Sequence, residues 1–479
     1  MVEQKKVGIT SLGAYLPYYY FERSKIGEAW GTRGKGKKAI CNSDEDSITM
    51  AVEAGLDTFR YLSRNEIGGL FFASTTVPYA EKSNATLIST VLDLNENVTT
   101  ADYNSSMRSA TAALRGAYME VKAGETNNVL VVASDKRNGY PKSDQESHFA
   151  DGAAAVVVGT EHVVATIDAF ATVQTEIVDM WRNIDDTYVR NAEGRFIYES
   201  GYLPSVKKAV EKLFEDNNLT ADDFEHIVFV SIDERSHLKA AKKLKLDPEK
   251  IVNASFAENG VLGASQPLFH LVQAIERANA GERILVVNYG NGADAIALTV
   301  TDEKEQIIKQ NSTDKYLDNR ASFNEYGRFL SFRGIIEAKP GEDYKIPGST
   351  SQTWREQETY LKLYGSKCNE CGNHIFPQER ICYHCRSLDN FEKVNKQEEV
   401  TTLFTYSIDN LAGRSDDPVV VQSVVEDQHG TRFYMNMTDF DVNEVGIDME
   451  LEFTLRKIHN LANFPNYYWK VRPLRRKVD

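Results

Sequence analysis

Two pairs of cysteines near the C-terminus constrain this chain more than any other feature of its sequence. Cys368 and Cys371 form one CxxC pair, Cys382 and Cys385 form a second, and ten residues separate the pairs. Two such turns can direct four thiolates to the corners of a tetrahedron, which is the geometry of structural Zn²⁺. Because four thiolates leave the metal no open position, we expect this zinc to have no catalytic role.

Five short runs after the cysteines alternate apolar and polar residues with the period of a β-strand. They are residues 400–408, 419–427, 432–440, 449–458 and 467–473. Five such strands predict a small Greek-key barrel of the OB type. We therefore expect a helix and a rubredoxin-like zinc ribbon at 346–390 and an all-β OB-fold barrel at 391–479.

The charge of the chain bears on its partners. The formal net charge is −15, from 70 acidic and 55 basic residues. OB barrels often bind oligonucleotides, but an acidic chain is a poor match for phosphates, so we expect no nucleic-acid partner. The sequence has no run of 18 apolar residues and no leader-like start, so we expect a cytoplasmic protein without a membrane partner.

Residues 1–305 alternate apolar runs with helical stretches, as α/β proteins do around a buried sheet. The apolar runs are residues 7–16, 70–75, 129–134, 153–160, 226–232 and 284–300, and the helical stretches are 46–62, 110–124 and 237–246. The strand, turn and strand of residues 129–159 return in residues 284–300. The pattern predicts a duplicated α/β domain over 1–305, followed by a linker at 306–345.

Five motifs of this domain, in unbroken order, resemble the 3-hydroxy-3-methylglutaryl-CoA synthases, especially the archaeal branch of that thiolase-superfamily family. They are DEDSITMAVEAG, STTVPYAEKSNATLI, DMWR, GRF followed by a tyrosine, and GERILVVNYGNGA. Residues 345–475 resemble the zinc-ribbon and OB-fold modules that accompany thiolase-like proteins. The resemblance implies a thiolase fold of α-β-α-β-α layers, a homodimer, an acyl-CoA substrate and carbon–carbon bond chemistry beside the thioester. It leaves open another subunit of an acyl-CoA-converting complex as a partner.

The same resemblance implies where the catalytic residues should lie, and the sequence departs from it at three of four places. The family uses a nucleophilic Cys, a general-base Glu, and a His and an Asn at the thioester oxygen. Met107 stands in the nucleophile's place and Thr75 in the place of the Glu, and no His ends the strand near Val230. Asn259 matches the family's Asn and is a candidate hydrogen-bond donor to a thioester or enolate oxygen.

Other residues in these segments are candidate substitutes. The acid–base candidates are Glu81, Asp233, His237 and the tyrosines Tyr79, Tyr140, Tyr202 and Tyr289, and the candidate nucleophiles are Ser105 and Ser106. Each also has a simpler interpretation: Glu81 as a solvated residue, His237 as a core or solvated residue, and most tyrosines as packing residues. Cys41, the one cysteine outside the zinc motif, precedes an acidic segment that disfavours a reactive thiolate.

Two basic clusters are candidate sites for the phosphates of CoA. Arg235, Lys239 and Lys242 fall on one expected helix, where the family meets CoA, and Arg33 and Lys35 form a second basic run. Cationic clusters on an acidic chain suit an anionic ligand, although a solvated charged face is the simpler interpretation.

Three functions remain open from the sequence. The first is aldol or retro-aldol chemistry on a β-hydroxyacyl-CoA, which needs a base and enolate stabilisation but no acyl-enzyme. The second is acyl transfer or thiolase-type condensation through another nucleophile such as Ser105 or Ser106. The third is a non-catalytic CoA-binding subunit of a larger complex.

Overall fold

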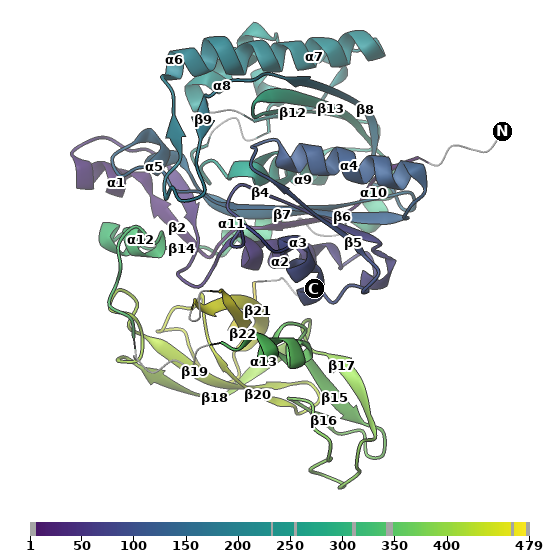
Figure 1. The fold of residues 1–479 in the computed structure, drawn as a ribbon, viewed down its shortest axis with the longest axis vertical. Coiled ribbons are helices and arrows are strands. Elements are labelled where there is room, and N and C mark those ends of the chain that lie inside the picture. Colours follow the sequence, from purple (N-terminus) through teal and green to yellow (C-terminus); the bar gives the residue numbers. More distant parts are fainter. Residues whose placement is uncertain are drawn as a thin grey trace, which may run out of the picture. The chain divides into compact units, whose positions relative to one another are not determined.

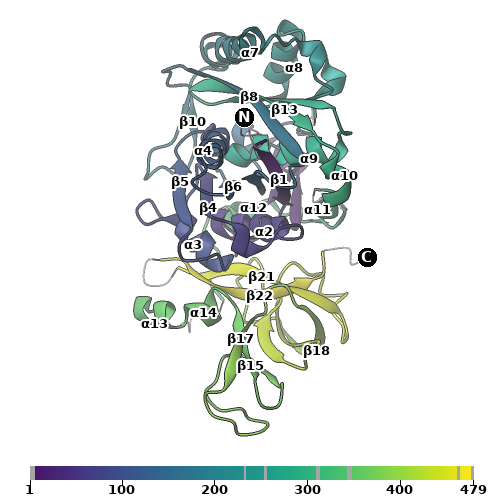
Figure 2. The same cartoon turned by 90° about the vertical axis from the view of Figure 1, so that its right-hand side faces the viewer.

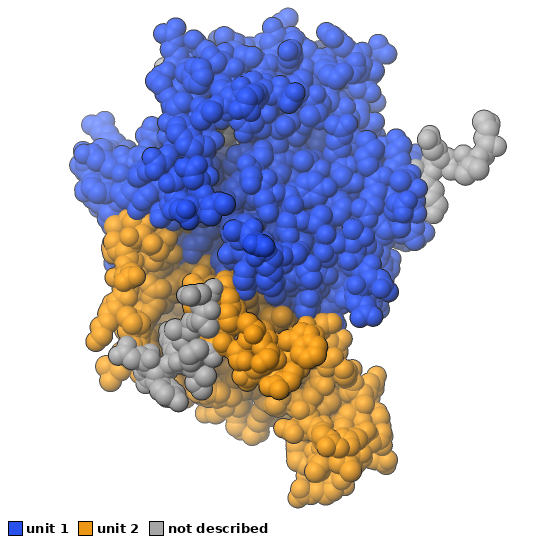
Figure 3. All heavy atoms as spheres, in the orientation of Figure 1, with its two compact units in different colours: residues 1–41, 46–326 blue, residues 42–45, 327–479 orange. Residues whose placement is uncertain are grey.

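The computed structural model describes residues 6–230, 233–252, 256–308, 313–341, 348–460 and 464–475, without the side chains of residues 234, 235, 306 and 307. The chain divides into two compact units, coloured separately in Figure 3. Unit 1 comprises residues 1–41 and 46–326, and unit 2 comprises residues 42–45 and 327–479.

A nine-stranded sheet runs through unit 1. In spatial order its strands are β11 (His226–Phe229), β12 (Arg283–Tyr289), β13 (Gly292–Val300), β8 (Ala165–Gln174), β1 (Gly8–Tyr15), β7 (Asp151–Gly159), β6 (Asn128–Lys136), β4 (Gly69–Ser74) and β5 (Thr99–Asn104). β1 and β8 share only the pairs Gly8–Thr166 and Ile9–Ala165. This narrow junction divides the sheet into a five-stranded half and a four-stranded half.

Helices separate and cover the two halves, so that helix and sheet layers alternate (Figure 1, Figure 2). The central layer holds α4 (Ser109–Ala123) and α9 (Gln266–Arg277), and α9 contacts β7 of one half and β11 and β12 of the other. The outer layers hold α2 (Ser47–Thr58) and α3 (Asn84–Val91) on one side, and α7 (Leu203–Asn217) and α8 (Glu234–Lys243) on the other. The predicted α-β-α-β-α layering is confirmed.

Helix α2 shows how the sequence produces this core. All of its residues are buried, and it packs against β1, β6 and β7. The helix begins where it does because Asp46 accepts hydrogen bonds from the backbone N–H groups of Ile48 and Thr49, while the Thr49 hydroxyl accepts from the Asp46 N–H. This reciprocal capping box satisfies donors that a buried helix end would otherwise leave unpaired.

Smaller elements complete unit 1. They are the sheet β14-β2-β3 (Ala321–Ser322, Tyr19–Glu22, Lys37–Ile40), the pair β9-β10 (Met180–Trp181, Arg190–Asn191), and the helices α1 (Arg23–Trp30), α5 (Asp144–His148), α6 (Gly194–Phe196), α10 (Glu303–Ile307) and α11 (Asp314–Asp318). The predicted linker at 306–345 thus contains folded elements, because β14 pairs with β2 and both α11 and α12 (Tyr326–Phe332) are helical.

Unit 2 contains the predicted ribbon and barrel. Two short helices, α13 (Thr350–Arg355) and α14 (Gln357–Tyr360), precede a three-stranded sheet of β16 (His374–Ile375), β15 (Tyr364–Cys368) and β17 (Phe391–Asn395). The barrel strands follow in the spatial order β20 (Arg432–Asn436), β19 (Val420–Asp427), β18 (Val400–Asp409), β21 (Glu450–His459) and β22 (Asn466–Pro473), all antiparallel. A bridge from Met437 to Val471 nearly closes the barrel, in agreement with the predicted OB type.

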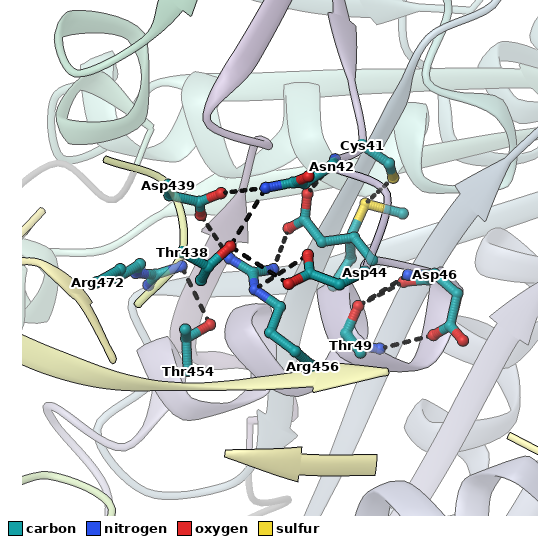
Figure 4. Close-up of polar contacts among 12 residues, drawn as sticks. Cys41, Asn42, Asp44, Asp46, Thr49, Thr438, Asp439, Thr454, Arg456 and Arg472 are labelled. Carbon is teal, nitrogen blue, oxygen red and sulfur yellow. Dashed lines mark hydrogen bonds and ion pairs between the residues drawn. The ribbon is translucent and has the colours of Figure 1, made fainter. Parts of the chain in front are cut away.

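Four residues from the N-terminal half of the sequence belong to unit 2. They are Asn42–Glu45, and their acidic side chains surround the buried guanidinium of Arg456 on β21 (Figure 4). Glu45 and Asp439 each lie 2.5 Å from this guanidinium, and Asp44 lies 3.7 Å from its Nε. Burial alone would raise the pKa of Asp44, but Lys470 and Arg456 hold it below its usual value.

Candidate active site

A cavity of about 320 Å³ lies within unit 1, and residues from both halves of the sheet line it. The lining residues that matter for chemistry are Thr75 after β4, Ser105, Ser106 and Met107 before α4, Arg137 after β6, Asp179 and Arg182 around β9, and Tyr289 at the end of β12. Apolar side chains, among them Phe149, Met180, Val189 and Val261, form much of the remaining wall. This cavity is our candidate active site.

The turn before α4 presents its residues to the cavity in a constrained backbone. Ser105 has a φ of 69°, in the left-handed region that non-glycine residues rarely adopt. The Ser106 hydroxyl accepts a hydrogen bond from the Arg108 N–H, and the side-chain amide of Asn288 donates to the Met107 carbonyl. Residue 290 must be glycine, because a Cβ there would lie 2.9 Å from the Met107 Cβ.

Sulfur chemistry in the cavity is limited to thioethers. No cysteine is among the described residues that line it, whereas Met107 and Met180 are. Cys41 is buried elsewhere, with its Sγ 3.4 Å from the Met50 Sδ. Thr75, which stands where the resemblance places a general-base Glu, has a hydroxyl instead of a carboxylate, and that hydroxyl donates a hydrogen bond to Asp135.

Asp135 is a fully buried hub behind the cavity wall. Its two oxygens accept hydrogen bonds from the hydroxyls of Ser74, Thr75 and Thr76 and from the N–H groups of Thr75 and Ala264. Five donors stabilise the carboxylate and fix the loop after β4 against residue 264. We therefore assign Asp135 to positioning the cavity wall.

Asp179 and Tyr289 form a buried pair in the cavity. The Tyr289 hydroxyl donates to Asp179 Oδ2 at 2.5 Å, and Asp179 Oδ1 accepts from the Met180 N–H. Burial, followed by the hydrogen bond to Asp179, raises the pKa of Tyr289 far above its usual value. Tyr289 therefore stays a neutral phenol at physiological pH, which suits it to relay a proton between a substrate and Asp179.

Two arginines face the same cavity. The Arg137 guanidinium lies 4.3 Å above the Phe149 ring and 3.0 Å from the Met180 Sδ. Its burial lowers its pKa to about 10, so that it remains charged. Arg182 donates to the Thr75 carbonyl at 2.7 Å and so holds the loop after β4.

Several candidates from the sequence lie outside the cavity. Asn259 accepts a hydrogen bond from Arg320 and lines a different, polar cavity. Glu81 is exposed, and Tyr140 is partly exposed and stacks on Tyr188. Asp233 caps α8 by accepting from the Ser236 N–H.

His237 is buried in the core of unit 1. Its ring lies between those of Phe229 and Phe256, at centroid distances of 5.3 and 5.6 Å. Among the catalytic candidates from the sequence, the structure thus brings Ser105, Ser106, Met107 and Tyr289 to the cavity.

Four of the five predicted CoA-binding cations, Lys239, Lys242, Arg33 and Lys35, are absent from the described lining of the cavity. Lys239 and Lys242 are exposed on α8, and Arg33 and Lys35 are exposed after α1. The Arg235 side chain lies outside the described residues. The Lys239 Nζ lies 4.2 Å from the centroid of the Tyr198 ring.

Reasoning from the sequence missed Asp135, Arg137, Asp179 and Arg182. Two of them stand in the DMWR motif, where an acid and a base flank two large apolar residues. The other two follow an apolar strand, at a strand end where polar side chains gather in α/β proteins. These four residues come together in space because segments that are distant in the sequence pack side by side. The spacing of residues along the chain does not reveal that arrangement.

The four cysteines of unit 2 converge as predicted. Their sulfur atoms all lie within 4.8 Å of one another, with Cys368 3.6 Å from Cys385 and Cys371 3.7 Å from Cys382. A tetrahedron of Zn–S bonds of about 2.3 Å has edges of about 3.8 Å. The donor set and its spacing therefore fit a structural Zn²⁺.

The lengths and polarity of the helices also show whether any of them could span a membrane. Within the described ranges, every helix is too short or too polar to span a bilayer.

Comparison with protein-family models gives three matches. The model for 3-oxoacyl-[acyl-carrier-protein] synthase III matches residues 101–174, and its C-terminal counterpart matches residues 214–301. The ChsH2 rubredoxin-like zinc ribbon matches residues 361–392.

The curated relatives and solved structures described next are HMG-CoA synthases or an HMG synthase. Hydroxymethylglutaryl-CoA synthase of Thermococcus sibiricus is 30% identical over 69% of this chain and 97% of its own length, and that of Methanopyrus kandleri is 29% identical over 68% and 98%. A solved HMG-CoA synthase complexed with CoA superposes with a TM-score of 0.63 at 19% identity, over 72% of this chain and 94% of that one. The curacin-pathway HMG synthase in complex with holo donor-ACP gives 0.62 at 19% identity, over 81% and 100%.

Proposed function

The chain belongs to the hydroxymethylglutaryl-CoA synthase family, and on that premise we propose that it acts on a CoA thioester and breaks or makes the carbon–carbon bond beside the thioester carbonyl. The fold of unit 1 agrees with this family, and the four-cysteine ribbon agrees with the ChsH2 rubredoxin-like zinc ribbon. The reaction takes place in the cavity between the two halves of unit 1.

The reaction proceeds without an acyl-enzyme, as an aldol or retro-aldol step on a β-hydroxyacyl-CoA. One observation carries this proposal: at the turn before α4 a thioether, Met107, faces the cavity, and an intact proton-transfer pair, Asp179 and Tyr289, faces it as well. A thioether is a poor acceptor of an acyl group. A retro-aldol step needs a base and a stabilised enolate, and it does not need a nucleophile.

The cavity supplies both requirements. In the cleavage direction, the β-hydroxyl gives its proton to the Tyr289 oxygen while Tyr289 passes its own proton to Asp179. The Cα–Cβ bond then breaks, the β-carbon leaves as an aldehyde or ketone, and the electron pair becomes the enolate of the shorter acyl-CoA. The N-terminal end of α4 adjoins the cavity and favours the negative enolate oxygen. Asp179 returns the proton to Cα through Tyr289.

The test is product analysis on a panel of β-hydroxyacyl-CoAs in the absence of free CoA. We expect a shorter acyl-CoA and a carbonyl compound in equal amounts. Products that form only after free CoA is added would instead indicate thiolysis. Binding without turnover across the panel would favour a non-catalytic CoA-binding subunit.

A second candidate, acyl transfer to serine, rests on Ser105. Its left-handed backbone places a hydroxyl in the cavity beside Met107. Intact-protein mass after brief exposure to acyl-CoAs separates the two candidates. An acyl-sized gain that hydroxylamine removes and that maps to Ser105 or Ser106 supports acyl transfer, whereas an unchanged mass supports the aldol route.

The homodimer and a further partner subunit remain proposals from the family. Light scattering of the purified chain, which gives its mass in solution, tests the first. Co-purification from the source organism tests the second.

A further inference from the structure

Arg108, at the start of α4, connects the two halves of unit 1 beside the cavity. The turn before α4 follows β5, which belongs to the five-stranded half of the sheet. The Arg108 guanidinium reaches the four-stranded half, where it donates to the Val173 carbonyl of β8 at 3.2 Å and to the Gly290 carbonyl after β12 at 2.9 Å. It also pairs with the Asp294 carboxylate of β13 at 3.1 Å. One side chain therefore joins the turn to the opposite half at three points.

Asp294 holds the beginning of α4 by a second route. Its other oxygen, Oδ2, accepts from the hydroxyl of Thr111 in the first turn of α4 at 2.6 Å. The Thr111 hydroxyl in turn accepts from the side-chain amide of Asn288 on β12 at 3.2 Å, and that amide also donates to the Met107 carbonyl at 3.1 Å. Asp294, Thr111 and Asn288 are all buried, so water competes little for these bonds. Asp294 thus fixes both Arg108 and Thr111.

The contacts of this network lie on both sides of Tyr289 in the sequence. The residue before it, Asn288, donates to the Met107 carbonyl, and the residue after it, Gly290, accepts from the Arg108 guanidinium. The network therefore sets the separation between Tyr289 and the turn, where the proposed reaction has its enolate oxygen.

We propose that Arg108 and Asp294 are positioning residues, which hold the turn of residues 105–107 at a fixed separation from Tyr289, so that groups from the two halves of unit 1 act on one substrate. Neither side chain is among the described lining residues, so each acts through the turn. The left-handed backbone of Ser105 needs such support, because strained conformations persist only where surrounding contacts determine them. The expected effect on turnover rests on the proposed function, whereas the position of the turn can be measured without turnover.

The effect on the reaction is measured by the turnover of a β-hydroxyacyl-CoA. We expect Arg108→Gln and Asp294→Asn each to lower kcat by about 30-fold and to leave KM within about threefold, because a small displacement weakens alignment in the transition state more than binding. Thr111→Val, which keeps the shape of the side chain but removes its hydroxyl, is expected to lower kcat by about 10-fold. Thr111→Ser, which keeps the hydroxyl, is expected to recover most of that loss.

The position of the turn is measured by NMR of the full chain with ¹³C-labelled methionine methyl groups. The Met107 signal, assigned by its loss in Met107→Leu, reports on the turn, and the Met50 signal reports on the core beside Cys41. We expect Asp294→Asn to shift or broaden the Met107 signal and to leave the Met50 signal in place. Thr111→Val, compared with Thr111→Ser, gives the same measurement if Asp294→Asn does not fold.

The matched control is Arg115→Gln. Arg115 is an exposed arginine about two turns further along α4, and its side chain bonds Thr172 of β8 at 3.0 Å. This variant is expected to keep the wild-type kcat and the wild-type Met107 signal.

An unmoved Met107 signal in Asp294→Asn would overturn the inference whatever the turnover, and so would a moved signal with an unchanged kcat. A moved signal, in a chain whose wild type cleaves no β-hydroxyacyl-CoA, would support the hold of Asp294 on the turn and refute the proposed reaction.

Discussion

The zinc ribbon of unit 2 and the candidate active-site cavity of unit 1 assemble their functional groups over very different lengths of chain. The ribbon takes all four thiolates from residues 368–385, within two turns of fixed spacing. The cavity takes its lining from residues 74–291, through the ends of β4, β6 and β12 and the turn before α4. The metal ligands of a ribbon of this kind are set by the spacing of cysteines along the sequence. The residues of the cavity come together only because particular strands pair with one another.

The largest effect should come from removing one ribbon thiolate. Cys382→Ser leaves three ligands for a metal whose binding contributes on the order of 10 kcal/mol to the folding of small zinc domains. We expect zinc content, measured by atomic absorption, to fall well below one ion per chain, and protease cleavage to increase within the ribbon. His384→Asn is the matched control, since His384 lies between two ligands but is exposed. Cys382→Ser protein that keeps a full complement of zinc would contradict a four-thiolate site.

Substitutions in the candidate active-site cavity should have the opposite result. They should lower the activity and leave the protein folded. We expect Tyr289→Phe and Asp179→Asn each to lower kcat by about 100-fold or more, because each interrupts the same proton relay. The double variant should lose little beyond the worse single variant, because residues that act as a unit are not additive.

The control for this pair is Tyr198→Phe. Tyr198 is buried near Tyr202, and its hydroxyl lacks a hydrogen-bond partner in the described part of the chain. Full activity of Tyr289→Phe with fold and substrate binding intact would remove Tyr289 from the mechanism.

The contrast between local and long-range assembly explains which features could be predicted from the sequence. The four ligands, the five barrel strands and the α/β character of unit 1 follow from spacing or periodicity, and the structure confirms them. The α-β-α-β-α layering was implied by the family resemblance, and the structure confirms it as well. Of the cavity's lining residues, the sequence offered Ser105, Ser106, Met107 and Tyr289 as catalytic candidates, and these stand in contiguous motifs. Asn259 matches a motif by position, but its backbone places it beside Arg320 instead. Arg137 follows a buried strand, and only the three-dimensional structure, in which it lines the cavity beside Phe149 and Met180, shows that it belongs to the site.

The barrel of unit 2 combines both situations. Its strands come from neighbouring segments of the sequence, whereas the buried charge cluster around Arg456 includes residues from far away in the sequence. Arg456 is fully buried, and two of its three acidic neighbours come from residues 44 and 45. Glu45→Gln removes one charge from a desolvated cluster, and we expect the free energy of unfolding of unit 2 to fall by about 3–5 kcal/mol.

The control is Glu426→Gln, which breaks an exposed pair with Arg432 on the same barrel and should cost less than about 1 kcal/mol. Urea unfolding followed by tryptophan fluorescence, to which the buried Trp469 on β22 contributes, measures both variants. Equal midpoints for the two would mean that residues 42–45 contribute little to the barrel.

The smallest expected effect concerns a residue that the sequence offered as catalytic and the structure places in the core. Burial lowers the pKa of His237 to about 4, with a further contribution from His270, against the attraction of Asp233. The unfolded chain binds a proton near pH 6.5, and the folded chain resists it down to about pH 4. His237 therefore costs no stability above pH 6.5, and its destabilising effect grows as the pH falls, reaching about 3 kcal/mol near pH 4. His237→Phe removes this effect while keeping a ring between Phe229 and Phe256.

We expect the difference in unfolding free energy between His237→Phe and wild type to increase in favour of the variant from pH 7 to pH 4.5. Comparing the two proteins at each pH cancels the carboxylates that titrate in both. His162→Asn is the control, because His162 is exposed on the surface of unit 1. If His237 instead served in catalysis, His237→Phe would abolish turnover at pH 7, where this core effect on stability is absent.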